Sequence, residues 1–151
     1  MNAEECTQGC CGVARRRTVS DCFDRGLRRN RTEPFDISGQ TLHDANGLEA
    51  QFSLKIENGL IGAVRFKVTS CVALTAYAEV LAEEAEKLSL VSAIAITPLD
   101  LIDLLDGVPL FRRDRANLAV AAFRSAIQFA TLQQQSGEPN ESRLHLRHAT
   151  A

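Results

Sequence analysis

The cysteines are the residues of this chain with the most chemical potential. The chain has 151 residues and five cysteines, and Cys6, Cys10 and Cys11 form a C-x₃-C-C group near its start. That spacing is not standard for zinc or ferredoxin sites. An odd number of cysteines argues against a complete disulfide framework, so we expect free thiols. These three thiols are weak metal-ligand candidates, and the alternative is that they are solvent-exposed and adventitiously reactive.

Cys71 stands alone in the middle of the chain, directly before a predicted helix. It could be a metal ligand or sulfur acceptor, because the dipole at a helix N-terminus lowers the pKa of a thiol. It could equally be a small buried hydrophobe, since free cysteine is among the most buried residue types. Both interpretations stay open. Cys22 lies on the apolar stripe of an earlier helix, so we expect it in the core.

A catalytic constellation is missing from the sequence. The three histidines, His43, His145 and His148, fall in a predicted loop and a polar tail. There is no Ser/His/Asp set and no glycine-rich phosphate loop. We therefore expect that the protein is not an enzyme.

Composition indicates one ordinary globular domain, with 45% hydrophobic and 24% charged residues. The net charge of -2 gives no general case for nucleic-acid binding. No apolar stretch approaches the ~20 residues of a membrane span, and the acidic N-terminus lacks the pattern of a secretory signal. We expect a cytoplasmic protein. The arginine-rich segment from Arg15 to Arg31, where only Asp21 and Asp24 are acidic, is either a solvated arm or a docking site.

The hydrophobic pattern predicts an α+β fold. Residues 18–29 have the stripe of a short helix, although Gly26 weakens it, and residues 30–47 have the composition of a loop with a short strand. Residues 50–68 alternate apolar and polar side chains on both sides of Asn58-Gly59, which predicts a β-hairpin.

Three helices should follow the hairpin. They run from Cys71 to about Leu88, from the N-cap Thr97 to about Leu105, and from Asp114 to Gln135, with Ala121 and Phe129 on the inner face of the last. We predict a small antiparallel sheet with its hairpin, followed by helices packed on one face. Residues 1–17 would form a flexible arm, 18–135 the domain and 136–151 a flexible tail.

The segment from Gly59 to Cys71, with Arg65-Phe66-Lys67 before Ser70-Cys71, resembles the central signature of the NifU N-terminal/IscU family. The similarity continues to Leu81. It returns in the last helix at Leu118-Ala119 and Ala122-Phe123, and Asp21-Cys22-Phe23 is similar to the family's Asp-His-Tyr. The resemblance implies a SufE/NifU-like fold and a role in iron–sulfur cluster assembly.

Members of that family hold a transient cluster on three cysteines, with the help of an Asp and a His. In this chain the first cysteine falls on Asn46 and the Asp on Leu48, while the second cysteine is Cys71. The His falls on Asp114 and the third cysteine on Arg115. The resemblance therefore implies that most ligand positions are lost, and no cysteine follows Cys71 that could restore one.

Other residues near these positions could substitute. His43 and Asp44 lie in the loop that the resemblance places beside the site, so they are replacement ligands or ordinary surface residues. Asp114 is either a ligand or the N-cap of the last helix. Positive charge opposes binding of iron or zinc cations, so the three arginines at the position of the third ligand favour an anion or an acidic partner surface, or form a solvated rim. They are Arg112, Arg113 and Arg115.

Three hypotheses remain at this point. The protein could be a divergent scaffold that still binds an iron–sulfur cluster, iron or zinc through Cys71 and unusual ligands. It could be a pseudo-scaffold, a binding or regulatory module that docks a cysteine desulfurase or another iron–sulfur assembly protein without a cluster. It could also be an unrelated small α+β domain.

Overall fold

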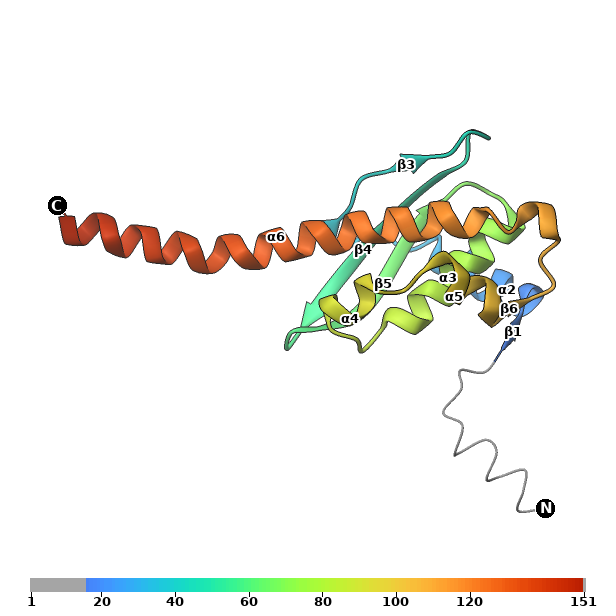
Figure 1. Cartoon of the computed structure of the whole chain (residues 1–151), viewed down its shortest axis with the longest axis horizontal. Helices are drawn as coiled ribbons and strands as arrows, with labels where there is room; N and C mark the ends of the chain where they lie inside the picture. Colours follow the sequence, from blue (N-terminus) through green and yellow to red (C-terminus); the bar gives the residue numbers. More distant parts are fainter. Residues whose placement is uncertain (1–15, 151) are drawn as a thin grey trace, which may run out of the picture.

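The structure is a computed structural model that describes the backbone of residues 16–150 and the side chains of residues 16–135. Figure 1 shows a small sheet crossed by one long helix, with shorter helices beside it. In chain order the elements are β1 (Arg17–Thr18), α2 (Val19–Arg29), β2 (Ile37–Ser38), β3 (Leu42–His43), β4 (Glu49–Glu57), β5 (Leu60–Val68), α3 (Val72–Ala85), α4 (Leu90–Ile94), α5 (Pro98–Leu104), β6 (Leu105–Asp106), the 3₁₀ helix η1 (Leu110–Arg112) and α6 (Arg115–Thr150).

The hairpin of β4 and β5 forms the centre of the sheet, as predicted. Asn58 and Gly59 both have positive φ, 55° and 77°, which lets the chain reverse in a tight turn. β2 and β3 both pair antiparallel with β4 along the edge that β5 leaves free. The antiparallel sheet is therefore built around β4.

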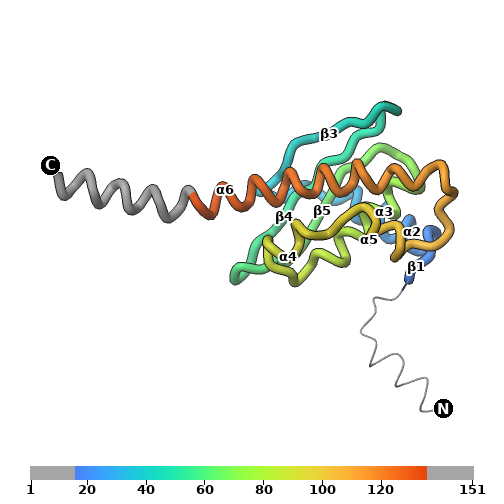
Figure 2. Tube along the Cα trace, viewed as in Figure 1, coloured from blue at the N-terminus to red at the C-terminus, as the bar shows by residue number. Residues whose placement is uncertain are grey.

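Helices α3 and α6 cover one face of the sheet, and the hydrophobic core lies between these helices and the sheet. Phe52 of β4 packs against Phe66 of β5 and Phe123 of α6, with both ring centroids 5.5 Å from its own. Figure 2 shows α6 crossing the sheet, with the short helices α4 and α5 beside it. The expectation of an α+β fold with helices on one face of a hairpin-containing sheet is confirmed.

Helix α2 packs closely on α3, and Gly26 makes that approach possible. A Cβ atom at Gly26 would lie 2.7 Å from Thr75 Cγ2 and 3.0 Å from the Thr75 carbonyl oxygen. The glycine that weakens the helical pattern in the sequence is thus required by packing. The predicted helix itself is confirmed, and it is capped by the Thr18 side chain.

An ion-pair network joins α2, α3 and β5. Arg29 donates from Nε and Nη2 to the two carboxylate oxygens of Glu79, at 2.7 and 3.1 Å. Its Nη1 donates to Glu86 at 3.0 Å and to the Val64 carbonyl oxygen at 2.5 Å. Although Glu79 is a charged residue, its side chain is only 2% exposed. Helix α2 covers it and supplies the arginine that pairs with it.

The free edge of β5 is closed by side chains from the same helices. The Val64 amide donates to Glu86, and the Val68 amide and carbonyl both bond to the side chain of Asn30. Unpaired edge groups invite pairing with another chain, so these contacts protect the edge.

The helices after the hairpin agree in part with the sequence prediction. α3 ends at Ala85, earlier than expected, and α5 begins at a capping box of Thr97 and Asp100. The predicted inner face of α6 is wrong at two positions, because Ala121 is exposed and Phe129 is 38% exposed. α4 and the parallel pairing of β1 with β6 were not predicted.

The predicted division into arm, domain and tail stays a prediction. Among the residues that the structure describes, no helix is long and apolar enough to cross a membrane.

Replacing Arg29 by alanine should destabilise the protein by about 3 kcal/mol, because it leaves the buried Glu79 carboxylate without its partner. Urea unfolding at pH 7 measures this. Arg31→Ala, at an exposed position two residues after Arg29, should change the free energy of unfolding by less than about 0.5 kcal/mol. Equal losses in both variants would contradict the structural role of the Arg29–Glu79 pair.

Candidate functional site

Cys71 is the N-cap residue of α3, in the short connection that follows β5. Its backbone is extended, with φ -151° and ψ 125°, and its side chain makes no capping hydrogen bond. The residue is half-buried at the rim of the core. Cys71 thus combines both expected features: it stands at a helix N-terminus and it packs on apolar side chains.

The Arg115 guanidinium occupies the space beside Cys71. Its Nη1 donates a hydrogen bond of 2.8 Å to Asp114 Oδ1, and its side chain is only 15% exposed. The hydrogen bond to Asp114 is the main cause of a raised pKa for Arg115, and an interaction with the Cys71 thiol adds to it. Its Nε is buried and has no partner among the described residues. The first residue of α6 therefore directs a permanent positive charge at the thiol.

Asp44 lies in the turn before β4, where the charge of Arg115 acts on its carboxylate. Its Oδ1 accepts hydrogen bonds of 2.9 Å from the Asn46 and Leu48 amides, which closes the turn between β3 and β4. Burial alone would oppose ionisation. The hydrogen bonds to these amides and the charge of Arg115 nevertheless hold the pKa of Asp44 below its ordinary value. Cys71, Asp44, Asp114 and Arg115 are called the Cys71 site below.

The donor set of the Cys71 site does not fit an iron–sulfur cluster. Clusters are held chiefly by several thiolates, and zinc usually takes four thiolate or imidazole ligands. The described residues contain no group of three or more His, Cys, Asp or Glu side chains that could hold a metal ion. The site has one thiol. The Arg115 guanidinium lies beside the carboxylates, where these would otherwise attract a metal cation. The arrangement is electrostatically satisfied without a metal.

Among the remaining predicted ligands, Asp114 lies in the Cys71 site and His43 does not. His43 lies in β3, exposed, with its Nε2 2.9 Å from Glu49 Oε2, and no described contact joins it to Cys71. The Asp114 carboxylate is bonded to Arg115 just before α6 begins. Cys6, Cys10 and Cys11 lie outside the described residues. Cys22 is fully buried, as predicted, and burial raises the pKa of its thiol to about 11.

An exposed apolar surface with two arginines lies next to this site. Leu110 and Phe111 on η1 are 76% and 74% exposed, and Val72, which follows Cys71, is 51% exposed. Arg112 and Val72 line one hollow of about 240 Å³, which places η1 beside the start of α3. Arg112 and Arg113 are exposed as well. We call Val72, Leu110, Phe111, Arg112 and Arg113 the η1 surface.

Tyr77 is a buried residue on which charges near the Cys71 site act. It is fully buried on α3, and its hydroxyl has no partner among the described residues. Burial is the main cause that raises the pKa of Tyr77, while the charges of Arg113 and Asp114 act on it in opposite directions. The helical spacing of Tyr77 could not indicate that it lies near the Cys71 site, because any core residue of the helix can have the same spacing.

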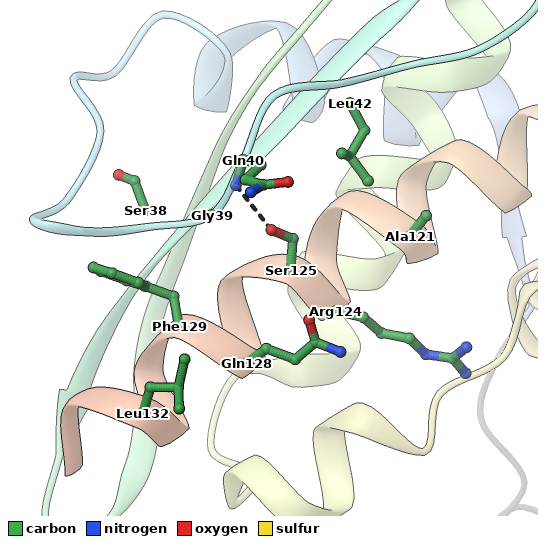
Figure 3. A pocket seen from close by; sticks show the side chains of 10 residues that line it. All are labelled: Ser38, Gly39, Gln40, Leu42, Ala121, Arg124, Ser125, Gln128, Phe129 and Leu132. Carbon is green, nitrogen blue, oxygen red and sulfur yellow. Dashed lines mark hydrogen bonds between the residues drawn. The ribbon is translucent and has the colours of Figure 1, made fainter. Parts of the chain in front are cut away.

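Figure 3 shows a different hollow, of about 530 Å³, between α6 and the segment that carries β2 and β3. The Gln40 amide donates to Ser125 Oγ across it at 2.8 Å. Arg124 points away and donates to the carbonyl oxygens of Ile94 and Ile96. With no carboxylate or thiol in its described lining, this hollow offers no chemistry for metal binding or proton transfer.

Comparison with known proteins shows that the chain matches one protein family. The family model described as NifU-like N terminal domain matches residues 16–135. No curated protein matches the sequence.

Solved structures with a similar backbone trace include two whose names refer to an iron–sulfur scaffold protein and to a NifU-like protein. One is described as a candidate iron–sulfur cluster assembly scaffold protein for the SUF system, from Fervidobacterium islandicum AW-1. It is 12% identical, with 74% of this chain and 91% of that chain covered and a TM-score of 0.44. The other is a nitrogen-fixing NifU-like protein, N-terminal part, from Brucella abortus, 15% identical, with 74% and 86% covered and a TM-score of 0.37.

Asp44→Ala should lower the free energy of unfolding by about 1 kcal/mol at pH 7, because two backbone amides lose a charged acceptor. The folded pKa of Asp44 lies below its unfolded value, so its contribution is present above the unfolded pKa and disappears as pH falls through the folded pKa. Urea unfolding at pH 7 and at pH 3 should therefore give a smaller difference between variant and wild type at pH 3. Asp36→Ala, at an exposed acid, is the control; an Asp44→Ala difference that does not shrink in acid would contradict this assignment.

Proposed function

The chain belongs to the NifU-like N-terminal domain family, and from this premise we propose that it serves iron–sulfur cluster assembly as a protein-binding module that carries no cluster at the Cys71 site. The proposed partner is a cysteine desulfurase or another iron–sulfur assembly protein, and the proposed place of action is the cytoplasm. The proposal assigns no catalytic step to this chain.

The observation that carries the proposal is the Arg115 guanidinium beside Cys71 and Asp114. At an effective dielectric constant of about 20, two unit charges 4 Å apart repel by about 4 kcal/mol. An iron cation that approached the thiol would meet this repulsion, and it would also compete with Arg115 for the Asp114 carboxylate. The guanidinium thus neutralises the site in place of a metal.

The η1 surface supports the second half of the proposal. Two large apolar side chains that are three-quarters exposed, flanked by two arginines, form the kind of surface that becomes buried when a partner binds. Aromatic and arginine side chains are enriched among the residues that dominate binding energy at interfaces. Because this surface borders the Cys71 site, a partner that docks there would also cover Cys71.

A second candidate function is residual binding of a cluster, iron or zinc through Cys71. The observation that favours it is the position of Cys71, a half-buried thiol at the start of α3, at the place where the family's second cysteine falls. A thiolate alone supplies one ligand, so this candidate requires further ligands from outside the Cys71 site.

Phe111→Ala should weaken binding of a cysteine desulfurase at least about tenfold if the η1 surface is the docking site. Isothermal titration calorimetry with the desulfurase from the same organism measures this. The matched control is Leu99→Ala, because Leu99 is 69% exposed but lies on α5. Binding that is absent in the wild type, or that is lost equally in both variants, would contradict the proposed docking surface.

A zinc titration tests whether Arg115 stands in a ligand position. In a background with Cys6→Ser, Cys10→Ser and Cys11→Ser, we expect Asn46→Cys with Arg115→Cys to raise zinc affinity at least about 100-fold over that background, because three thiolates then surround one point.

Asn46→Cys with Arg113→Cys adds the same number of thiols and serves as the matched control. It should give little gain, and Cys71→Ala should abolish the gain of the Arg115→Cys variant. An equal gain in the control would show that Arg115 does not occupy a ligand position.

A further inference from the structure

A third hollow, lined by arginines, plays no part in the proposed function. It measures about 420 Å³ and opens between the C-terminal half of α2 and β5. Arg25, Arg28 and Arg29 of α2 and Arg65 of β5 line it, together with the apolar ring of Phe35. These residues include the end of the arginine-rich segment that the sequence shows between Arg15 and Arg31.

Two of the four arginines are neutralised inside the molecule. Arg25 Nε lies 2.7 Å from Glu83 Oε2, and Arg29 is bonded to Glu79 and Glu86. These contacts belong to the network that fixes α2 on α3. The charges of Arg25 and Arg29 are therefore neutralised within the protein and offer little to a ligand.

Arg28 and Arg65 carry the excess charge of the hollow. In the described part of the chain neither forms an ion pair, although Asp24 stands one helical turn before Arg28. Arg65 is held in place by its own surroundings. Its guanidinium carbon lies 4.1 Å from the Phe35 ring centroid, and its Nη1 donates to the Glu33 carbonyl oxygen at 2.7 Å. A guanidinium has five donors, so this preorganised group keeps most of them for a ligand.

The mode of binding is limited by the edge of β5. Its outward groups at Val64 and Val68 are already bonded to side chains of Glu86, Arg29 and Asn30. A partner segment cannot add there as a further strand, so contact must be made through side chains.

We propose that this hollow between α2 and β5 binds an acidic segment of a partner protein, whose Asp or Glu carboxylates pair with Arg28 and Arg65. The planar fork of a guanidinium matches a carboxylate in a two-point hydrogen bond. The positive charge is local, because the whole chain has a net charge of -2. A long polyanion such as nucleic acid would meet repulsion from the rest of such a surface, whereas a short acidic segment would not.

The test is fluorescence anisotropy with a fluorescein-labelled peptide of six glutamates separated by glycines, in 50 mM salt. We expect saturable binding to the wild-type chain that weakens in 200 mM salt. Arg28→Gln with Arg65→Gln should weaken it at least tenfold. The exposed Arg28→Gln alone should still weaken it about threefold, so the result does not depend on how well the double variant folds.

The matched control is Arg112→Gln with Arg113→Gln, which removes two exposed arginines from the η1 surface. It should change the peptide affinity less than twofold. Absence of binding, or an equal loss in this control, would overturn the proposal. Displacement of the peptide by low-millimolar inorganic phosphate, or tighter binding of a labelled single-stranded 12-mer DNA than of the peptide, would overturn it as well, because the hollow would then serve small anions or nucleic acid.

Discussion

The structure depends on one buried ion pair, between Arg29 at the end of α2 and Glu79 in the middle of α3. Glu79 is almost completely buried, and a carboxylate in that position is stable only with a partner that bonds both of its oxygens. Arg29 does so while also bonding to Glu86 and to the backbone of β5. Burial raises the pKa of Glu79 above its ordinary value, and the hydrogen bonds and charge of Arg29 oppose that shift. Through this pair, α2, α3 and the sheet are held in one arrangement.

A second guanidinium has the same role at the functional end of the molecule. The fixed positions of α3 and α6 bring Cys71 and Arg115 together, and Asp44 joins them through the turn before β4. In both places an arginine side chain neutralises acidic groups that would otherwise need another cation. For Glu79 the outcome is a stable core, and for Cys71 it is a site whose charges are balanced without a metal. Under the proposed function, the chain keeps the fold of the family, and the residues at the ligand positions serve a different purpose.

Much of the fold could be predicted from the sequence, because local signals and packing agree there. Alternation around Asn58-Gly59 predicts the hairpin, and Thr97 with Pro98 predicts the start of α5. Other features could not be predicted from the sequence. Glu79 looks like a surface residue in the helical pattern, since nothing in its own helix indicates that α2 will cover it. The family resemblance placed Arg115 at a ligand position, but only the structure shows its guanidinium bonded to Asp114. His43 and Asp44 are adjacent in sequence, yet His43 faces Glu49 on the neighbouring strand, while Asp44 accepts hydrogen bonds from the Asn46 and Leu48 amides.

The measurement that tests the central claim most directly is anaerobic reconstitution of the full chain with iron and sulfide, followed by visible absorbance and by iron and sulfide analysis. Wild type and Cys71→Ala are compared. If Arg115 fills the cation position, wild type should bind no more iron and sulfide than Cys71→Ala and should show no cluster absorbance that depends on Cys71. A stoichiometric chromophore in the wild type that disappears in Cys71→Ala would contradict the account and would establish this protein as a cluster-carrying scaffold with a rearranged ligand set.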